Sequence, residues 1–145
     1  MADPRVFYSR DVKVAWRNHL SRFELVEPYD VLWVDGEGET LAQFTVEAGL
    51  LTDGPSIPKR LRGIVPWYGH HFQPAVTHDD CYQHHHGLDR TQADLLFLEG
   101  MADEGVPWLR RRVMYHAVSL FGGSSWKPED REAVEPFPGG LDFLD

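Results

Sequence analysis

The sequence has a single cysteine, Cys81, which excludes an intrachain disulfide and with it the disulfide-braced folds of small secreted domains. It also lacks an apolar run long enough to cross a membrane. The segment Met1–Arg5 lacks the apolar core of a secretory signal. These absences predict a protein that is not transmembrane and that is made in a cytoplasm.

Positive charge is scarce in the sequence. Lysine and arginine number 14 against 23 aspartate and glutamate residues, which gives a formal net charge of −9. Since such a surface would repel the phosphates of nucleic acids, we expect no direct binding to DNA or RNA. The charge is unevenly distributed, because Arg110-Arg111-Arg112 is a local basic run whereas the C-terminal segment is acidic.

The remaining composition fits one globular domain of the α+β class. With 145 residues, 42% of them hydrophobic, the chain is large enough to bury a core. Short apolar runs within residues 10–50 predict a small antiparallel sheet, with a hairpin over residues 31–46. Three helices are predicted in the C-terminal half. We expect residues 1–126 to form the domain and residues 127–145 to be an acidic arm rich in proline and glycine.

Capping residues delimit the predicted helices. The first runs from Pro74 to just before Gly87, since proline suits the first helical position and glycine the position after the end. The second begins after Asp89, where Gln92 completes a variant of the capping box. The third extends from about residue 107 to residue 121. Its three arginines are expected on the solvated side, and its apolar side comprises Leu109, Val113, Ala117, Leu120 and Phe121.

The first predicted helix carries the most informative group of residues, His78, Asp79 and Tyr82. At 3.6 residues per turn His78 and Tyr82 share one face, whereas Asp79 points about 100° away. His78 could therefore act as a base or ligand while Asp79 reaches a cation. The alternative interpretation is an ordinary core histidine in a capped helix, and the nearby acidic residues weigh against it.

Asp94 on the second helix is the expected partner for this group. The short connection between the helices predicts antiparallel neighbours. A strictly antiparallel pair would place Asp94 level with Tyr82, about one turn from His78. Either the helices cross at an angle, or Asp94 holds Tyr82 and another group orients His78.

The stretch Leu51–Pro58 combines Asp53 with two hydroxyl side chains in a loop that two prolines stiffen. One interpretation is a tight turn in which Asp53 caps its own backbone. The other is a loop that supplies Asp53, or backbone oxygens, to the His78 region.

Several motifs follow one another in a fixed order along residues 20–126: Thr52-Asp53-Gly54-Pro55-Ser56-Ile57-Pro58, Ala75-Val76-Thr77-His78-Asp79-Asp80-Cys81-Tyr82, Arg90, Ala93-Asp94, Phe97, Arg110-Arg111-Arg112-Val113-Met114-Tyr115 and Phe121-Gly122-Gly123. This series resembles a family of small proteins of uncharacterised function found in tailed phages, prophages and gene transfer agents. The resemblance implies a phage setting, hence synthesis in the bacterial host cytoplasm and a place in the virion or in the host cell. It implies no particular reaction.

The pair His78-Asp79 with Tyr82, followed by Asp94 on the next helix, is similar to the active-site helices of the phospholipase A2 superfamily. The resemblance implies that His78 activates a water, Asp79 binds Ca²⁺, Asp94 orients His78 and Tyr82 supports Asp94. The glycine-rich calcium loop of that superfamily is reduced here to Trp67-Tyr68-Gly69, so Asp53 would replace its ligands. Mg²⁺ and, given the surrounding histidines, Zn²⁺ stay open as alternatives.

Three functions are compatible with these residues. The first is a phage hydrolase that acts on an ester or amide of the host envelope, in lipid or cell wall. The second is a tail, neck or assembly component without chemistry, in which the polar cluster is structural and the C-terminal arm binds neighbouring phage subunits. The third is an inhibitor of a host defence enzyme.

Overall fold

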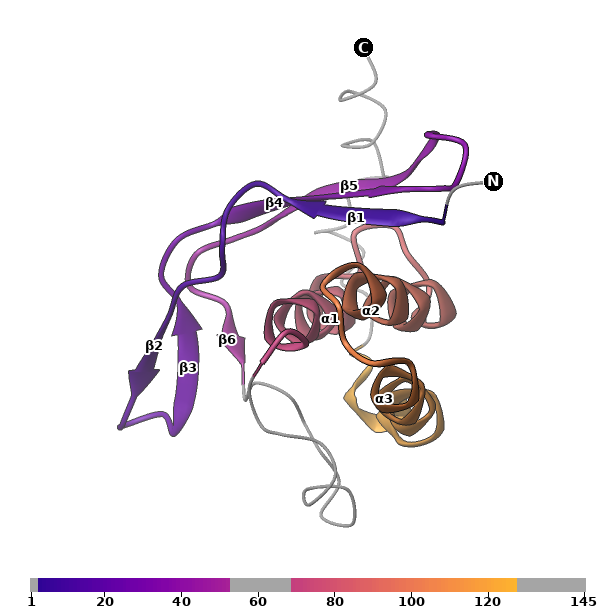
Figure 1. Ribbon diagram of the computed structural model, residues 1–145. Helices are drawn as coiled ribbons and strands as arrows, with labels where there is room; N and C mark the ends of the chain where they lie inside the picture. Colours follow the sequence, from indigo (N-terminus) through magenta and orange to yellow (C-terminus); the bar gives the residue numbers. More distant parts are fainter. Residues whose placement is uncertain (1–2, 53–68, 128–145) are drawn as a thin grey trace.

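The computed structural model of the protein describes residues 3–52 and 69–127, and it has the predicted α+β arrangement (Figure 1). Two antiparallel sheets of three strands occupy the N-terminal half, and three helices follow. The first sheet has the order β1-β4-β5. Its strands are β1 (Arg5–Tyr8), β4 (Tyr29–Val34) and β5 (Thr40–Val46).

The second sheet has the order β2-β3-β6 and lies at the side of the molecule (Figure 1). Its strands are β2 (Val14–Arg17), β3 (Arg22–Leu25) and β6 (Leu51–Thr52). The antiparallel strands predicted within residues 10–50 are confirmed, but they are divided between two sheets rather than joined in one. The chain leaves the β2–β3 hairpin to form the β4–β5 hairpin, and then returns to pair β6 with β3.

The predicted hairpin is confirmed as β4 and β5, and its side chains alternate between the core and the surface. Tyr29, Val31 and Trp33 are buried on β4, and they lie opposite buried or half-buried partners on β5. In the turn, the Asp35 carboxylate accepts hydrogen bonds from the backbone N–H groups of Glu37 and Glu39. Because a strand alternates with a period of two, this pattern fixes which face of the sheet meets the helices.

Helix α1 (Phe72–His84) begins two residues before Pro74 and ends earlier than predicted. After His84 the chain turns through the left-handed region at His85, His86 and Gly87, with φ of 60°, 55° and 79°. Left-handed backbone is ordinary for glycine but unfavourable for the two histidines. Contacts of both histidine side chains, described below, hold the turn in place.

Helix α2 (Arg90–Asp103) has the predicted start. The Asp89 side chain accepts from the Gln92 backbone, and the Gln92 side chain accepts from the Asp89 N–H, which is a complete capping box. Helix α3 (Trp108–Phe121) follows Pro107 as predicted and continues into the short 3₁₀ helix η2 (Gly122–Ser125). Among the described residues, no helix combines the length and apolarity that spanning a membrane requires.

Helices α1 and α2 pack side by side beneath the first sheet, and α3 lies on the other side of α2 from that sheet (Figure 1). The main core joins Val31 and Phe44 of the sheet to Val76, Cys81 and Leu96 of the helices. A smaller core joins the three helices to one another and comprises Ala75, Phe97, Met101, Val106 and Met114. This smaller core sets the positions of the three helices around the candidate site.

Polar contacts also join the first sheet to the helices. The hydroxyls of Tyr29 and Thr77 lie 2.8 Å apart in the core. The Trp33 indole N–H donates to the Glu99 carboxylate. Burial raises the pKa of Glu99 above its ordinary value, and the bond from Trp33 opposes that shift.

The apolar side predicted for α3 does not face the core. Leu109, Leu120 and Phe121 are exposed, and Met114 is the buried residue of the helix. Arg110 and Arg111 are only half-exposed, and Arg111 donates to the carbonyl of Val106. The prediction was wrong because a helix of mixed pattern packs by whichever stripe fits its neighbour, here the stripe around Met114.

Candidate functional site

His78 and Asp94 lie next to each other across the α1–α2 interface. His78 Nε2 donates to Asp94 Oδ1 at 2.7 Å. The side chains are 11% and 4% exposed, so the pair is largely shielded from water while His78 keeps a small accessible surface. A carboxylate can only accept hydrogen bonds, so an ionised Asp94 fixes the proton on Nε2 and leaves Nδ1 able to take up a proton.

Tyr82 completes the contact predicted from the helix spacing. Its hydroxyl donates to the same Asp94 oxygen, Oδ1, at 2.5 Å. The Tyr82 ring lies against the His78 ring with the centroids 4.2 Å apart, and Phe97 packs on the imidazole at 4.8 Å. The two aromatic rings restrict rotation of the imidazole about its side-chain bonds, so His78 has a defined orientation.

Burial and the neighbouring Asp94 raise the pKa of Tyr82 above its ordinary value. Burial is the larger cause, because it disfavours the charged phenolate. Tyr82 therefore stays protonated in the physiological range and remains a donor to Asp94. The sequence prediction that Tyr82 supports Asp94 is compatible with this geometry, although its catalytic role stays a prediction.

Helix α3 closes the site from the third side through Arg90, a residue to which no role had been assigned. Arg90 Nε donates to the Tyr82 hydroxyl at 3.2 Å, and its Nη2 donates to the carbonyls of Val118 and Ser119 at 2.9 and 2.8 Å. Ser119 Oγ in turn makes a long hydrogen bond of 3.4 Å to Asp94 Oδ2. One guanidinium thus ties the end of α3 to the hydrogen-bonded group around Asp94.

Two glycines allow η2 to approach this group closely. A Cβ atom on Gly122 would lie 3.0 Å from the Tyr82 hydroxyl, and one on Gly123 would lie 3.3 Å from Arg90 Nη1. Glycine fits here because it has no side chain. Its backbone freedom is not needed, since the φ of Gly122 is −79° and suits any residue.

The structure describes only one of the two predicted metal ligands, Asp79. Asp79 is half-buried on α1 and takes part in interactions of its own. Asp53 lies outside the described residues, as do residues 54–58 of the same stretch, whereas Leu51 and Thr52 form β6. Within residues 3–52 and 69–127, no three histidine, cysteine, aspartate or glutamate side chains come close enough together to hold a metal ion.

Comparison with known proteins places this arrangement in a family. Residues 23–118, from β3 to α3, match the family described as "Protein of unknown function (DUF1353)". The chain belongs to the DUF1353 family. This confirms the expectation of an uncharacterised family, and the description states neither a phage setting nor a reaction. Searches among curated proteins and among solved structures found no match to the chain.

This DUF1353 chain contains a second histidine–carboxylate pair, which the sequence did not indicate. His86 Nε2 donates to Asp80 Oδ2 at 2.5 Å, and the His86 ring stacks on Phe44 with the centroids 4.3 Å apart. Asp80 and His86 are six residues apart, which is not a spacing that brings side chains together on a helix. Their contact depends on the left-handed turn after His84, so helical periodicity could not have revealed it.

The histidine run at the end of α1, His84-His85-His86, is mostly packed into the fold rather than solvated. Only His84 is exposed. His85 is buried against Trp126, ring on ring at 3.9 Å, and Trp126 also packs on Tyr82 at 5.1 Å. The segment after η2 therefore folds back over α1 beside the candidate site of the DUF1353 chain.

Two surface hollows formed by described residues lie away from His78. One runs along the outer side of α3. The other lies between the loop after β1 and the ends of α1 and α2, where it is lined by Asp11, His70, Gln73 and Glu104 among others. Neither hollow includes His78, whose side chain is 11% exposed.

Proposed function

We propose that this DUF1353 chain is a phage-encoded hydrolase in which His78 acts as a general base on water. The observation that carries the proposal is the hydrogen bond of 2.7 Å between His78 Nε2 and Asp94 Oδ1. A histidine whose far nitrogen is held by a buried carboxylate is a common arrangement for a base, because the carboxylate stabilises the imidazolium that forms. The supporting contacts of Tyr82 and Ser119 keep that carboxylate in place.

The proposed reaction is the attack of water on an ester or amide carbonyl. His78 Nδ1 takes a proton from the water as its oxygen bonds to the carbonyl carbon. The bond to the leaving group then breaks, and the same proton passes from Nδ1 to the departing oxygen or nitrogen. Asp94 stays ionised throughout and balances the positive charge of the intermediate imidazolium.

A hard divalent cation fits this reaction, and Asp79 is the residue that would hold it. Ca²⁺ prefers carboxylate and carbonyl oxygens, and such an ion would stabilise the negative charge that develops on the carbonyl oxygen. Asp53 is the proposed second carboxylate ligand. Mg²⁺ and Zn²⁺ are the alternatives that metal analysis would distinguish.

The proposed substrate is an ester or amide of the host envelope, in lipid or in cell wall. Support comes from the similarity of the His78-Asp79, Tyr82 and Asp94 pattern to the phospholipase A2 superfamily. It also comes from the ordered motifs that resemble proteins of phages and prophages. The synthesis of the protein in the bacterial host, and its place in the virion or the host cell, belong to the same proposal.

The test is a hydrolysis screen on phospholipid vesicles and purified peptidoglycan, with and without Ca²⁺, Mg²⁺ and Zn²⁺. We expect His78→Ala to remove activity on the responsive substrate and His19→Ala, at an exposed position far from the site, to retain it. Metal analysis of the purified protein, together with Asp79→Asn, tests the cation separately. Activity that survives His78→Ala would contradict the proposal.

A non-enzymatic virion or assembly component is the second candidate. The observation that favours it is that one hydrogen-bonded group joins α1, α2 and α3 while His78 is only 11% exposed. In this case the group serves as a cross-link between the helices. His78→Ala would then lower the free energy of unfolding by several kcal/mol, as loss of a buried polar partner does, with no activity to lose.

A further inference from the structure

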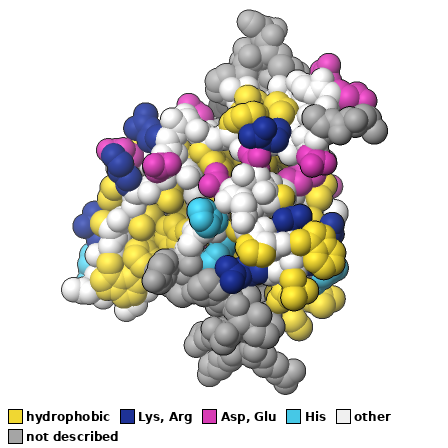
Figure 2. All heavy atoms as spheres, viewed as in Figure 1, with side chains coloured by type: hydrophobic (Ala, Val, Ile, Leu, Met, Phe, Trp, Pro, Cys, Tyr) yellow, Lys and Arg dark blue, Asp and Glu magenta, His cyan; other side chains and the backbone are white. Residues whose placement is uncertain are grey.

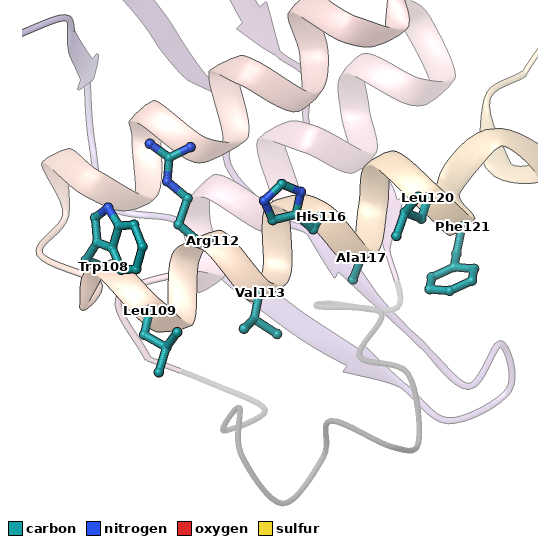
Figure 3. Close-up of a pocket in the computed structure, with 8 residues that line it drawn as sticks. All are labelled: Trp108, Leu109, Arg112, Val113, His116, Ala117, Leu120 and Phe121. Carbon is teal, nitrogen blue, oxygen red and sulfur yellow. The ribbon is translucent and has the colours of Figure 1, made fainter.

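The outer side of α3 forms an apolar groove, which we call the α3 groove, of about 590 Å³ (Figure 3). Trp108, Leu109, Leu120 and Phe121 line it together with Val113, and the first four are 60–73% exposed. Figure 2 shows apolar side chains gathered on the surface over this helix. A patch in which four large apolar side chains of one helix face outward is typical of a surface that binds a partner.

Among the described residues that line the α3 groove, Arg112 is the one arginine. Helix α3 contains three arginines and no acidic residue, in a chain with a net charge of −9. The Arg112 guanidinium lies over the Trp108 ring at 5.8 Å from its centroid, so one cation sits on the rim of the groove. The partner that fits such a surface is a segment that combines apolar and acidic residues.

We propose that residues 128–145 of the same chain bind in the α3 groove. This segment contains six acidic residues and one arginine, a net charge of −5. Its apolar residues are spread among them and include Phe137, Leu141, Phe143 and Leu144. Residues 53–68, by contrast, carry three basic residues and one acidic residue, so the arginines of α3 would repel them.

The described chain ends on α1, six residues after Phe121, the last residue of α3. The Lys127 N–H donates to the Tyr82 carbonyl at 3.1 Å. Gly122, the residue after Phe121, approaches the Tyr82 hydroxyl so closely that a Cβ there would lie 3.0 Å away. Only residues 122–127 separate Phe121, at one end of the groove, from the acidic segment, so the segment needs no long linker to reach the groove.

The segment is long enough to follow the whole groove. The 14 residues of α3 extend about 21 Å at 1.5 Å per residue. Eighteen extended residues can extend about 60 Å at roughly 3.3 Å per residue. A second copy of the domain is a poorer occupant, because two α3 grooves face to face would bring two Arg112 side chains together.

The experiment uses the full chain with a nitroxide on a single introduced cysteine, Gly140→Cys. Cys81 will not react, because it is fully buried and burial raises the pKa of its thiol. We expect the nitroxide to broaden the amide and Trp108 indole signals of α3 in a ¹⁵N spectrum. Leu120→Ser or Arg112→Glu in the labelled chain should restore these signals, and added salt should weaken the broadening.

Leu41→Ser is the matched control, since Leu41 is an exposed leucine on β5 and not part of the groove, and it should leave the broadening unchanged. Unaltered α3 signals in the labelled chain, or broadening confined to the sheets, would overturn the proposal.

Mixing nitroxide-labelled protein with ¹⁵N protein that carries no label tests exchange between molecules. Broadening of α3 signals in that mixture would overturn binding within one chain and assign the groove to the segment of a second copy.

Discussion

A single oxygen atom of Asp94, Oδ1, accepts hydrogen bonds from both Tyr82 at 2.5 Å and His78 at 2.7 Å. His78 and Tyr82 are one helical turn apart, and their rings lie against each other at a tilt of 44°, which brings Nε2 and the hydroxyl to the same point. The sequence had left open whether Asp94 serves one or the other. The structure shows that one carboxylate reaches both, so a change at Asp94 affects the imidazole and the phenol together.

Asp94→Asn should reduce any hydrolysis by His78 on the order of 100-fold or more, the typical contribution of a positioned acid–base group. An asparagine can donate as well as accept, so the imidazole is no longer held with its proton on Nε2. The ¹⁵N chemical shifts of the His78 ring, which differ between the tautomers, report this change without a substrate. Unchanged ring shifts would contradict the assigned hydrogen bond.

Gly122→Ala should destabilise the fold, because its Cβ would lie 3.0 Å from the Tyr82 hydroxyl. Overpacking of this kind costs about 1–3 kcal/mol. Urea denaturation measures the change, and Ser125→Ala in the same short helix, at an exposed position, is the matched control. If alanine is accepted at residue 122 at no cost, the close approach of η2 to Tyr82 is wrong.

His86→Ala should cost more than His84→Ala, although the two residues are neighbours in the same run. Removing His86 leaves the Asp80 carboxylate, 2% exposed, without its ring donor, and an unpaired buried charge costs about 3–5 kcal/mol. His84 is exposed at the end of α1. Thermal or urea unfolding of the two variants compares them directly, and equal stabilities would contradict the contact.

Glu99→Gln should remove a component of the pH dependence of stability. Burial raises the folded-state pKa of Glu99 above its unfolded value. The contribution to stability is therefore fully present below the unfolded pKa and is lost as the pH rises through the folded pKa. Glutamine keeps an oxygen for the Trp33 indole and has no charge to desolvate.

Unfolding free energies of Glu99→Gln and of the unaltered chain, measured from acid to neutral pH, test this difference. We expect the glutamine variant to gain relative stability as the pH rises above about 4.5, the ordinary value for a glutamate carboxyl. Glu37→Gln, at an exposed position in the β4–β5 turn, is a control carboxylate outside the core. A glutamine variant that loses relative stability as the pH rises would contradict the direction of the shift.

Local sequence signals determined the pieces of this protein. Three kinds of signal act within a few residues. They are the capping box at Asp89, the glycines with positive φ in the β4–β5 turn and after α1 and α2, and the alternation of buried residues in β4 and β5. For the same reason the α+β class, the β4–β5 hairpin and the placement of His78 and Tyr82 on one helical face could be read from the chain. These features depend on backbone geometry that neighbouring residues dictate.

Tertiary structure alone decided how those pieces meet. The split into two sheets, the anchoring of α3 by Arg90, the closeness of Gly122 to Tyr82 and the Asp80–His86 pair all join residues whose spacing carries no periodic signal. The exposure of the apolar side of α3 was likewise decided by tertiary structure. Which face of an element is buried depends on how well its side chains fit those of its neighbours. That fit is a property of the assembled fold, and no single segment determines it.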